Sequence, residues 1–567
     1  MRKYLFTMMG IIMSSNIIIA QNAPKWADKS KKAVFSVITY DKTNKIKNTG
    51  NGFYINDNGM ALSDYTLFDG ADRAVIVNAD GKELPIESIQ GANSIYDVIK
   101  FKVAPDKKSV SLKVAQNAPA IGETVYLLPY STQKEATCQT GKILKVDTIA
   151  DKGFYYTLDF KTNPKIISCP IMNANGEVIG AIQKNASDND KESYAIGASY
   201  GASLSISPLS ANDASLNKIG IKKGLPDTED QALVYLMMAS GQLTPEEYLS
   251  KINDFIQMYP NNADGYLRRA TYYMNLNQSA TNELADNDIK KLMDLSKNKD
   301  EGMYNAAKLI YSYNITMGDK NTNNSWSYDK ALSLTRDAIK VNPTPIYTQL
   351  EGDILFAMRN FAEAFNSYQK VNHSNLASAA TYFSASKAKQ LTEGADMNEA
   401  VALLDSAVAK FTKPYVADAA PYIYERGALK AQLGKHREAV ADYNTFSDIL
   451  IGNVSAQFYY QREQSEIQCK MYQQALNDIN KAVEMEPTDA VYWTEKGSLH
   501  IRIGQIKEAV EALEKAISLD NKAAEAYRML GYCMVQQKKN AEACANFAKA
   551  KELGDKVAES LIAKYCK

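Results

Sequence analysis

Histidine and cysteine supply many of the catalytic and metal-binding side chains of proteins, and this chain holds few of either. Its three histidines are His373, His436 and His500. Each falls in a separate stretch with helical periodicity, and the cysteine spacings match no zinc motif. The sequence therefore predicts no metal site and no cofactor. Residues 1–228 contain no histidine, so a mechanism that needs an imidazole as general base cannot operate in that region.

Residues 1–20 have the pattern of a secretory signal peptide. A basic start is followed by an apolar run over residues 5–19 and by the small residue Ala20. Polar residues at 14–16 interrupt this run, which is already shorter than the roughly 20 residues of a membrane-spanning helix. We therefore favour cleavage after Ala20 over a membrane anchor, and expect a soluble protein in the periplasm or outside the cell. No cysteine near the cut could carry a lipid.

Six cysteines in an exported chain favour disulfides. We expect one bridge between Cys138 and Cys169, and a second between Cys544 and Cys566 that ties down the last helix. Cys469 has no evident partner and fits a buried free thiol equally well.

Length and charge set wide limits on the function. A chain of 567 residues is long enough for two or more folded units. Lys and Arg total 65 and Asp and Glu total 65, so the net charge is zero. A balanced surface provides no field for capturing nucleic acid or an anionic membrane.

The first half of the chain alternates short apolar runs with turn signals. Tripeptides that end in Gly59, Gly81 and Gly176 provide the positive φ angles of tight turns. Many short strands without helices between them indicate a sandwich or barrel. The expected strands are 33–40, 52–55, 74–77, 97–103, 124–128, 141–146, 154–160 and 178–182. A polar stretch at 210–229 reads as a linker.

From about residue 230 the apolar period changes from 2 to 3.6, and a 34-residue repeat appears near the C-terminus. The repeated small residues are Gly497 and Gly531; Ala475, Ala509 and Ala543; and Ala482, Ala516 and Ala550. This period is the signature of tetratricopeptide (TPR) helical hairpins, in which a small residue lets two helices approach closely. We expect about eight hairpins over 230–567, with a capping helix at 557–565.

Three segments of the first half resemble the Deg/HtrA branch of trypsin-like peptidases. Residues 50–71 contain a glycine-rich strand, a hairpin and the segment Ser63-Asp64-Tyr65-Thr66-Leu67, where the family has Thr-Asn-x-His-Val. Residues 94–99 resemble the segment with the triad aspartate, and 171–180 resemble the strands after the nucleophile. The resemblance implies a double β-barrel over residues 21–209, followed by the all-α TPR solenoid.

The departures from this family fall on its chemistry. The resemblance places Thr66 at the histidine position, Asp97 at the aspartate position and Ile167 at the nucleophile position. A one-residue slip would place Ser168 there, or Cys169, with Lys165 as a conceivable base. Without an imidazole, we expect a degenerate triad and a chain that is not an enzyme.

A TPR array presents a concave groove that suits peptides or partner helices. The 34-residue register predicts nine lining side chains: Tyr460, Gln464, Gln468, Thr494, Ser498, Arg502, Arg528, Tyr532 and Gln536. The leading hypothesis is a non-catalytic scaffold that binds protein or peptide partners through this groove and the inactive peptidase-like domain. The alternative is a trypsin-like serine endopeptidase whose TPR array recruits substrates. A third possibility is a structural component of the cell envelope.

Overall fold

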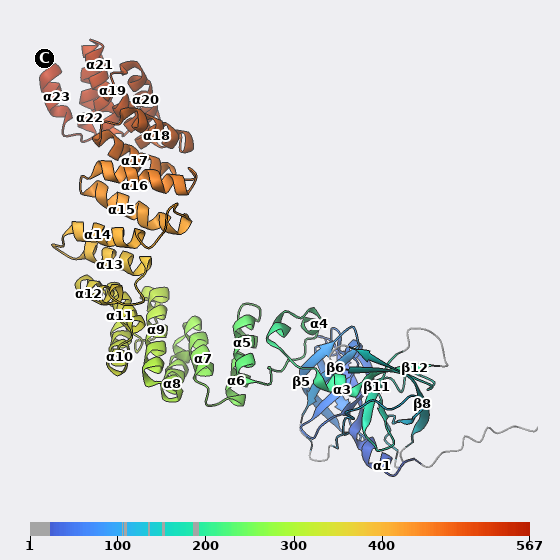
Figure 1. Cartoon of the computed structure of the whole chain (residues 1–567). Helices are drawn as coiled ribbons and strands as arrows, with labels where there is room; N and C mark the ends of the chain where they lie inside the picture. The colour runs from blue at the N-terminus through green and yellow to red at the C-terminus, as the bar shows by residue number, and fades with distance from the viewer. Residues whose placement is uncertain are drawn as a thin grey trace, which may run out of the picture. The chain divides into compact units, whose positions relative to one another are not determined.

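The computed structural model describes residues 23–104, 106, 110–133, 137–149, 153–184 and 192–566. The expected signal peptide, residues 1–20, lies outside them. The chain divides into two compact units, Met1–Tyr272 and Tyr273–Lys567 (Figure 1). The first contains the β-barrels and the second most of the helices. No helix in the described part of the chain combines the length and the apolar character that crossing a membrane requires.

The first barrel is a closed sheet in the order β1-β2-β3-β6-β5-β4. Its strands are β1 Val34–Tyr40, β2 Ile46–Tyr54, β3 Met60–Ser63, β4 Arg73–Val77, β5 Glu83–Asn93 and β6 Val98–Val103. Strand β1 closes the barrel because it pairs with β2 on one edge and with β4 on the other. Its alternate residues Phe35 and Val37 are fully buried, as the period of two predicts.

The second barrel repeats the topology of the first. Read from β7, its closed order is β7-β8-β9-β12-β11-β10, which matches the first barrel strand for strand. Its strands are β7 Thr124–Leu127, β8 Gln139–Ile149, β9 Gly153–Leu158, β10 Pro170–Met172, β11 Val178–Ile182 and β12 Ser193–Gly197. The predicted double β-barrel is confirmed. The sequence pattern did not predict β3, β5, β10 and β12. Strands β3 and β10 are short, and β5 and β12 lack a long apolar run.

An apolar layer joins the two barrels. It contains Phe53 and Leu62 from the first barrel and Met172 and Ile196 from the second, all buried. The three predicted turns form as expected, since Gly59, Gly81 and Gly176 have φ angles of 83°, 76° and 77°. The barrels therefore share a core that fixes the loops between them.

The segment 210–229, expected to be a linker, packs into the core of the first barrel. It contains the end of a 3-10 helix, Pro208–Asn212, and the short helix α4, Ala214–Asn217. Leu216, Ile219, Ile221 and Leu225 are buried there. The segment is not an exposed linker because its apolar residues, although separated by polar ones, are buried in the core of the first barrel.

A long series of helices follows. Their bounds are α5 Glu229–Ala239, α6 Pro245–Met258, α7 Ala263–Leu276, α8 Ser279–Leu295, α9 Lys299–Met317, α10 Tyr328–Val341, α11 Pro345–Ala357, α12 Phe361–Asn372, α13 Ala379–Leu391, α14 Met397–Val408, α15 Ala420–Gln432, α16 His436–Ile449, α17 Ala456–Gln468, α18 Tyr472–Met485, α19 Ala490–Arg502, α20 Ile506–Leu519, α21 Ala524–Gln536, α22 Asn540–Glu552 and α23 Ala558–Tyr565. Consecutive helices from α9/α10 to α21/α22 pack as pairs, which confirms the predicted solenoid.

The repeated glycines perform the role that the 34-residue period predicts. A Cβ atom on Gly497 would lie 2.5 Å from Cγ of Leu513, and one on Gly531 would lie 2.6 Å from Cε1 of Phe547. Both distances are far below van der Waals contact, so only glycine allows α19 to approach α20, and α21 to approach α22, this closely.

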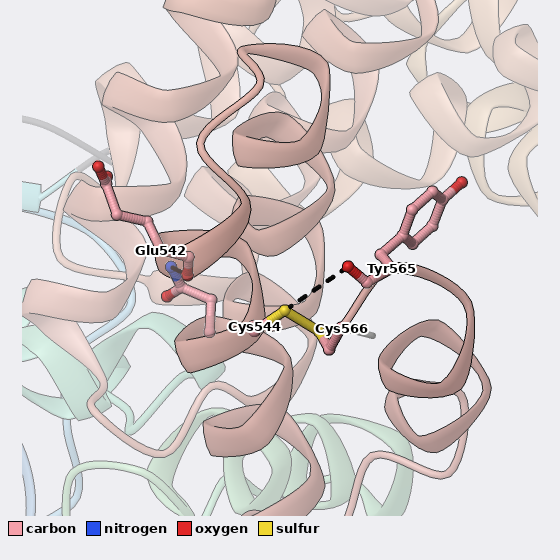
Figure 2. Close-up of a disulfide and its surroundings, with 5 residues drawn as sticks. Glu542, Cys544, Tyr565 and Cys566 are labelled. Atoms are coloured by element: carbon pink, nitrogen blue, oxygen red, sulfur yellow. Dashed lines mark hydrogen bonds between the residues drawn. A yellow bond between two sulfur atoms is a disulfide. The ribbon is translucent and has the colours of Figure 1, made fainter.

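One of the two expected disulfides is present. Cys544 on α22 is bonded to Cys566, which follows α23 and fixes this closing helix to the array (Figure 2). The expected pairing of Cys138 with Cys169 is wrong, because both are free thiols. Cys169 lies in the core of the second barrel, whereas Cys138 packs against the layer between the barrels.

Candidate functional site

The two residues predicted to occupy the histidine and aspartate positions of a triad meet between the barrels. The Asp97 carboxylate accepts hydrogen bonds from the backbone N–H of Thr66 at 2.7 Å and from its hydroxyl at 2.8 Å. Thr66 lies in the one-turn helix α2, Tyr65–Phe68, which follows β3. The threonine hydroxyl therefore takes the place of an imidazole N–H as a donor to the aspartate.

The loop that carries Asp97 is anchored by the second barrel. The Gln183 side-chain amide, which follows β11, donates hydrogen bonds to the backbone carbonyls of Tyr96 and Asp97. Asp97 itself has a φ of 45°, in the left-handed region that non-glycine residues rarely adopt. Such strained residues persist where surrounding contacts fix them, and they cluster at functional sites.

The predicted nucleophile segment is the tight turn before β10. The Ser168 backbone N–H donates to the Ile182 carbonyl at 2.8 Å, and Ser168 has a φ of 62°. Its side chain is fully buried, whereas Ile167 is half-buried and Lys165 is exposed. The strained φ at Ser168 thus turns its hydroxyl away from solvent and into the protein.

Asn51 holds this turn from the first barrel. Its side-chain amide donates to the carbonyls of Lys165 at 3.0 Å and Ile167 at 2.8 Å. Asn51 lies on β2 and is itself buried, so these hydrogen bonds cross between the barrels without competition from water.

Asp64 is the residue of this site that sequence reasoning missed. It directly precedes α2, and only 4% of it is exposed. Burial raises the pKa of its carboxyl well above the usual range, and the negative charge of Asp97 adds to the rise. The nearby Ser168 hydroxyl acts in the opposite direction, although Ser168 Oγ and Asp64 Oδ1 each lack a hydrogen-bond partner within the described residues. Its signal in the sequence was a carboxylate two residues before Thr66, within a segment that resembles the peptidase family.

Cys169 is a poor nucleophile in this setting. It is fully buried, and burial raises the pKa of its thiol to about 12. Because the thiolate is the reactive form, this cysteine is inert at neutral pH. The Lys165 side chain is exposed and makes no hydrogen bond or ion pair within the described part of the chain, which leaves Ser168 and Asp64 as the candidate nucleophile and base.

The residues predicted to line the TPR groove differ in their exposure. The exposed or half-buried ones are Tyr460, Gln464, Gln468, Arg502, Tyr532 and Gln536. Thr494 and Ser498 are buried, and the Thr494 hydroxyl donates to the Ala490 carbonyl at 2.8 Å, so these two do not face a ligand. Arg528 is paired with Glu525 at 2.6 Å and with Asp555 at 2.7 Å.

Carboxyl groups at this face were also missed. Glu463 on α17 is fully buried, and Glu495 on α19 is half-buried beside it. Burial and the neighbouring Glu495 raise the pKa of Glu463 to about 9. No group of three or more histidine, cysteine, aspartate or glutamate side chains among the described residues has an arrangement that could hold a metal ion.

The comparisons with known proteins agree with both parts of the fold. Residues 50–180 match the model of the trypsin-like peptidase domain, and residues 490–522 match the tetratricopeptide repeat. A DegP-like periplasmic serine endoprotease of Halomonas elongata is 30% identical over 144 residues, which are 24% of this chain and 29% of that protein. The serine protease HhoA of Synechocystis is 31% identical over 152 residues, or 24% of this chain and 36% of that protein.

The helical part has relatives of its own. The small glutamine-rich tetratricopeptide repeat-containing protein 2 of Saccharomyces cerevisiae is 30% identical over 97 residues, 17% of this chain and 28% of that protein. The crystal structure of a serine endoprotease from Yersinia pestis matches with 18% identity and a TM-score of 0.27, covering 31% of this chain and 62% of that one. The chain spans about a third of the length of the curated relatives it matches. It combines a Deg-type trypsin-like peptidase domain with tetratricopeptide repeats.

These matches correct one expectation. The prediction that the chain is not an enzyme is wrong, because the matched family is a peptidase domain and the relatives that share it are named serine endoproteases. That prediction was based on the absence of any histidine in residues 1–228. It overlooked Asp64, a buried carboxyl near Ser168.

Proposed function

We propose that this protein is a trypsin-like serine endopeptidase of the periplasm or the secreted space, and that its TPR array recruits protein substrates. The barrel domain would cleave the substrate chain, and the helical array would bind it. The match to a peptidase domain over residues 50–180 and the matches to TPR proteins support this division of work.

The observation that carries the proposal is a buried pair of polar groups, because Ser168 Oγ and Asp64 Oδ1 each lack a hydrogen-bond partner within the described residues and the hydroxyl lies near enough to lower the pKa of the carboxyl. Because residues 1–228 contain no histidine, the base must be another group, and the Asp64 carboxyl is the buried acid near the serine hydroxyl. A carboxylate with a raised pKa is a stronger base than an ordinary one, so the same burial that disfavours its charge makes it a better proton acceptor.

The reaction follows from this pair. Ser168 Oγ attacks the carbonyl carbon of the scissile peptide, and its proton passes to the Asp64 carboxylate. Asp64 then gives that proton to the leaving amine as the C–N bond breaks, which leaves an acyl ester on Ser168. Water attacks the ester and passes one proton to Asp64, which gives that proton to the Ser168 oxygen as the ester C–O bond breaks; this releases the acid product and restores the serine hydroxyl and the Asp64 carboxylate. The hydrogen bonds from Thr66 hold the charge of Asp97 in place near Asp64.

The turn of Ser168 must open for a substrate to enter. Ser168 is fully covered, and Asn51 holds the carbonyls of Lys165 and Ile167 on either side of it. Breaking these two hydrogen bonds would allow residues 165–169 to move and expose the hydroxyl to a peptide carbonyl.

The test is the cleavage of an unfolded protein, such as reduced casein, by the purified full chain. We expect the wild type to release peptides and Ser168→Ala to release none. Ser205→Ala is the matched control, because Ser205 is an exposed serine of the same unit. Equal cleavage by wild type and Ser168→Ala, or no cleavage by folded wild type, would contradict the proposal.

A further inference from the structure

A cluster of three glutamates lies on successive first helices of the C-terminal repeats. It consists of Glu463 on α17, Glu495 on α19 and Glu525 on α21, and we call it the glutamate cluster. The negative charges of all three act on the hydroxyl of Tyr460, and the Tyr460 ring contacts the Tyr492 ring at 5.5 Å between centroids. The three carboxyls therefore converge on one aromatic patch.

The charge of this cluster is only partly balanced. Glu525 is paired with Arg528 at 2.6 Å, and Arg502 attracts Glu495 weakly from an exposed position. Gln464 donates to the Glu463 carboxyl at 2.8 Å. None of these contacts places a cation between Glu463 and Glu495.

The cation nearest to Glu463 along its own helix is already in use. Arg462 makes two hydrogen bonds to the Asp478 carboxylate, at 2.6 and 2.8 Å, and lies 3.9 Å from Glu466. The ring of Phe458 also lies under its guanidinium group. This arginine is therefore committed to the interior of the α17/α18 pair.

Besides the incompletely balanced charge, an unpaired atom of Glu463 is a second, independent indication of a ligand. The residue is fully buried, yet its Oε1 atom finds no hydrogen-bond partner within the described part of the chain. A buried acceptor without a partner costs free energy, and native structures keep such atoms where a ligand or another function uses them. Its neighbour Glu495 is half-buried and is therefore the carboxyl of the pair that a ligand can reach from solvent.

We propose that the glutamate cluster binds an arginine or lysine side chain of the recruited polypeptide. A guanidinium group donates in a planar fork that matches a carboxylate and stacks on an aromatic ring, and the half-buried side chains of Glu495 and Tyr460 offer these two kinds of contact. The inference rests on the proposed function in one respect, namely that the TPR array is the part that holds the substrate. It adds the chemical class of the segment that is held, which is basic.

Proton release should accompany binding. Burial and neighbouring acids raise the pKa of Glu463 to about 9, so this residue of the empty cluster holds a proton near neutral pH, and burial also raises the pKa of Glu495. A bound cation favours the ionised carboxyls, and affinity for an arginine peptide should therefore rise as the pH rises from 6 to 9. The ionisable groups that face these two glutamates are Tyr460 and Glu466 on α17, Asp478 on α18, Arg502 on α19, and Glu525 on α21.

The experiment measures binding without cleavage. In the full chain carrying Ser168→Ala, fluorescence anisotropy follows a labelled Gly/Ser peptide with two arginines and the same peptide with two citrullines, which keep the shape and lose the charge. We expect the arginine peptide to bind at least about tenfold more tightly, and Glu495→Gln to remove most of that difference. Glu463→Gln should flatten its dependence on pH.

The matched control is Glu514→Gln, which removes an exposed carboxyl from α20. It should leave both affinities unchanged. Equal binding of the two peptides, or an unchanged preference in Glu495→Gln, would overturn the inference. Casein cleavage measured separately on the Ser168 wild type reports on the proposed function, so a failure of binding and a failure of cleavage are distinguishable.

Discussion

Each region of the molecule buries a carboxyl group, and the two groups have different neighbours. In the barrel unit, Asp64 faces the hydroxyl of Ser168 and the charge of Asp97. In the helical array, Glu463 faces the carboxyl of Glu495. Burial raises the pKa of both. A carboxyl beside a hydroxyl can take a proton, whereas a carboxyl beside another carboxyl can hold a cation.

The two regions also position these groups by different means. The barrel site depends on contacts between distant segments, such as the hydrogen bonds from Asn51 to the turn at 165–167 and from Gln183 to the loop at 96–97. In the array, each helix contacts mainly its neighbours, so the glutamates align because their helices repeat. A mutation in the barrel site should therefore displace several of its segments, whereas a mutation in the array should affect only the neighbouring helices.

The largest expected effect of a single carboxyl is that of Asp64→Asn on catalysis. An amide cannot accept the serine proton, so we expect the rate of casein cleavage to fall by about 100- to 10,000-fold. In the wild type the rate should rise with pH above the usual range of an aspartate, because Asp64 must lose its proton and its pKa is raised. Cleavage assays between pH 4 and 9 measure both effects.

Asp69→Asn is the control, since this half-buried carboxyl lies at the other end of α2. It should retain the wild-type rate. If Asp64→Asn cleaves casein at the wild-type rate, Asp64 is not the proton acceptor, and the contrast between Asp64 and Glu463 no longer holds.

The second prediction is Phe547→Ala, which tests how local the array is. Phe547 is fully buried between α21 and α22, and its removal should cost about 3–5 kcal/mol in the stability of the C-terminal repeats. Urea unfolding followed by circular dichroism gives the change. Casein cleavage in the absence of urea should stay close to that of the wild type if the barrel is independent, and Val557→Ala, at an exposed site, should change neither quantity.

The third prediction concerns the closing helix. Replacing Cys544 and Cys566 together by serine removes the bond that fixes α23 (Figure 2). For a loop of this size we expect a loss of about 3 kcal/mol, measured as a lower midpoint of thermal unfolding. The reduced wild type should behave like the double variant, whereas Cys469→Ser should respond to reductant as the wild type does. An unchanged midpoint would show that packing alone holds α23.

The smallest effect is the dependence of stability on the charge of Glu463. Its folded pKa of about 9 lies above the ordinary value of 4.5, so its contribution to stability is complete below about pH 4.5 and is lost as the pH rises through 9. Glu463→Gln cannot ionise, so it should keep the stability that the wild type loses as the pH rises from 6 to 9. Urea unfolding at pH 6 and at pH 9 measures this change in the free energy of unfolding, with Glu514→Gln as the control. A parallel pH dependence in wild type and Glu463→Gln would contradict the assigned burial.

Much of the fold could be predicted from local sequence signals. The turns at Gly59, Gly81 and Gly176 and the 34-residue spacing of Gly497 and Gly531 are encoded in a few neighbouring residues. The Cys544–Cys566 disulfide also followed from the order of elements at the C-terminus. Thr66 and Asp97, which the resemblance to the peptidase family aligned with neighbouring triad positions, are joined by a hydrogen bond.

The parts that the sequence did not reveal depend on contacts between distant segments. Asp64 is notable only because the turn at Ser168, about a hundred residues later, packs onto it. The apolar side chains at 216–225 looked like isolated residues of a linker until the first barrel supplied their core. The even number of cysteines allowed Cys138 to pair with Cys169, but the two residues pack in different hydrophobic cores.

The most direct test of the central claim is covalent labelling by a fluorophosphonate, followed by mass spectrometry of the full chain. The probe reacts with a serine whose hydroxyl is activated by a neighbouring base. We predict one labelled peptide, which contains Ser168, labelling that is lost in Ser168→Ala and in Asp64→Asn, and faster labelling in Asn51→Ala. A folded wild type that cleaves casein but carries the label on another serine, or one with no label at all, would contradict the assignment of Ser168 and Asp64 as the catalytic pair.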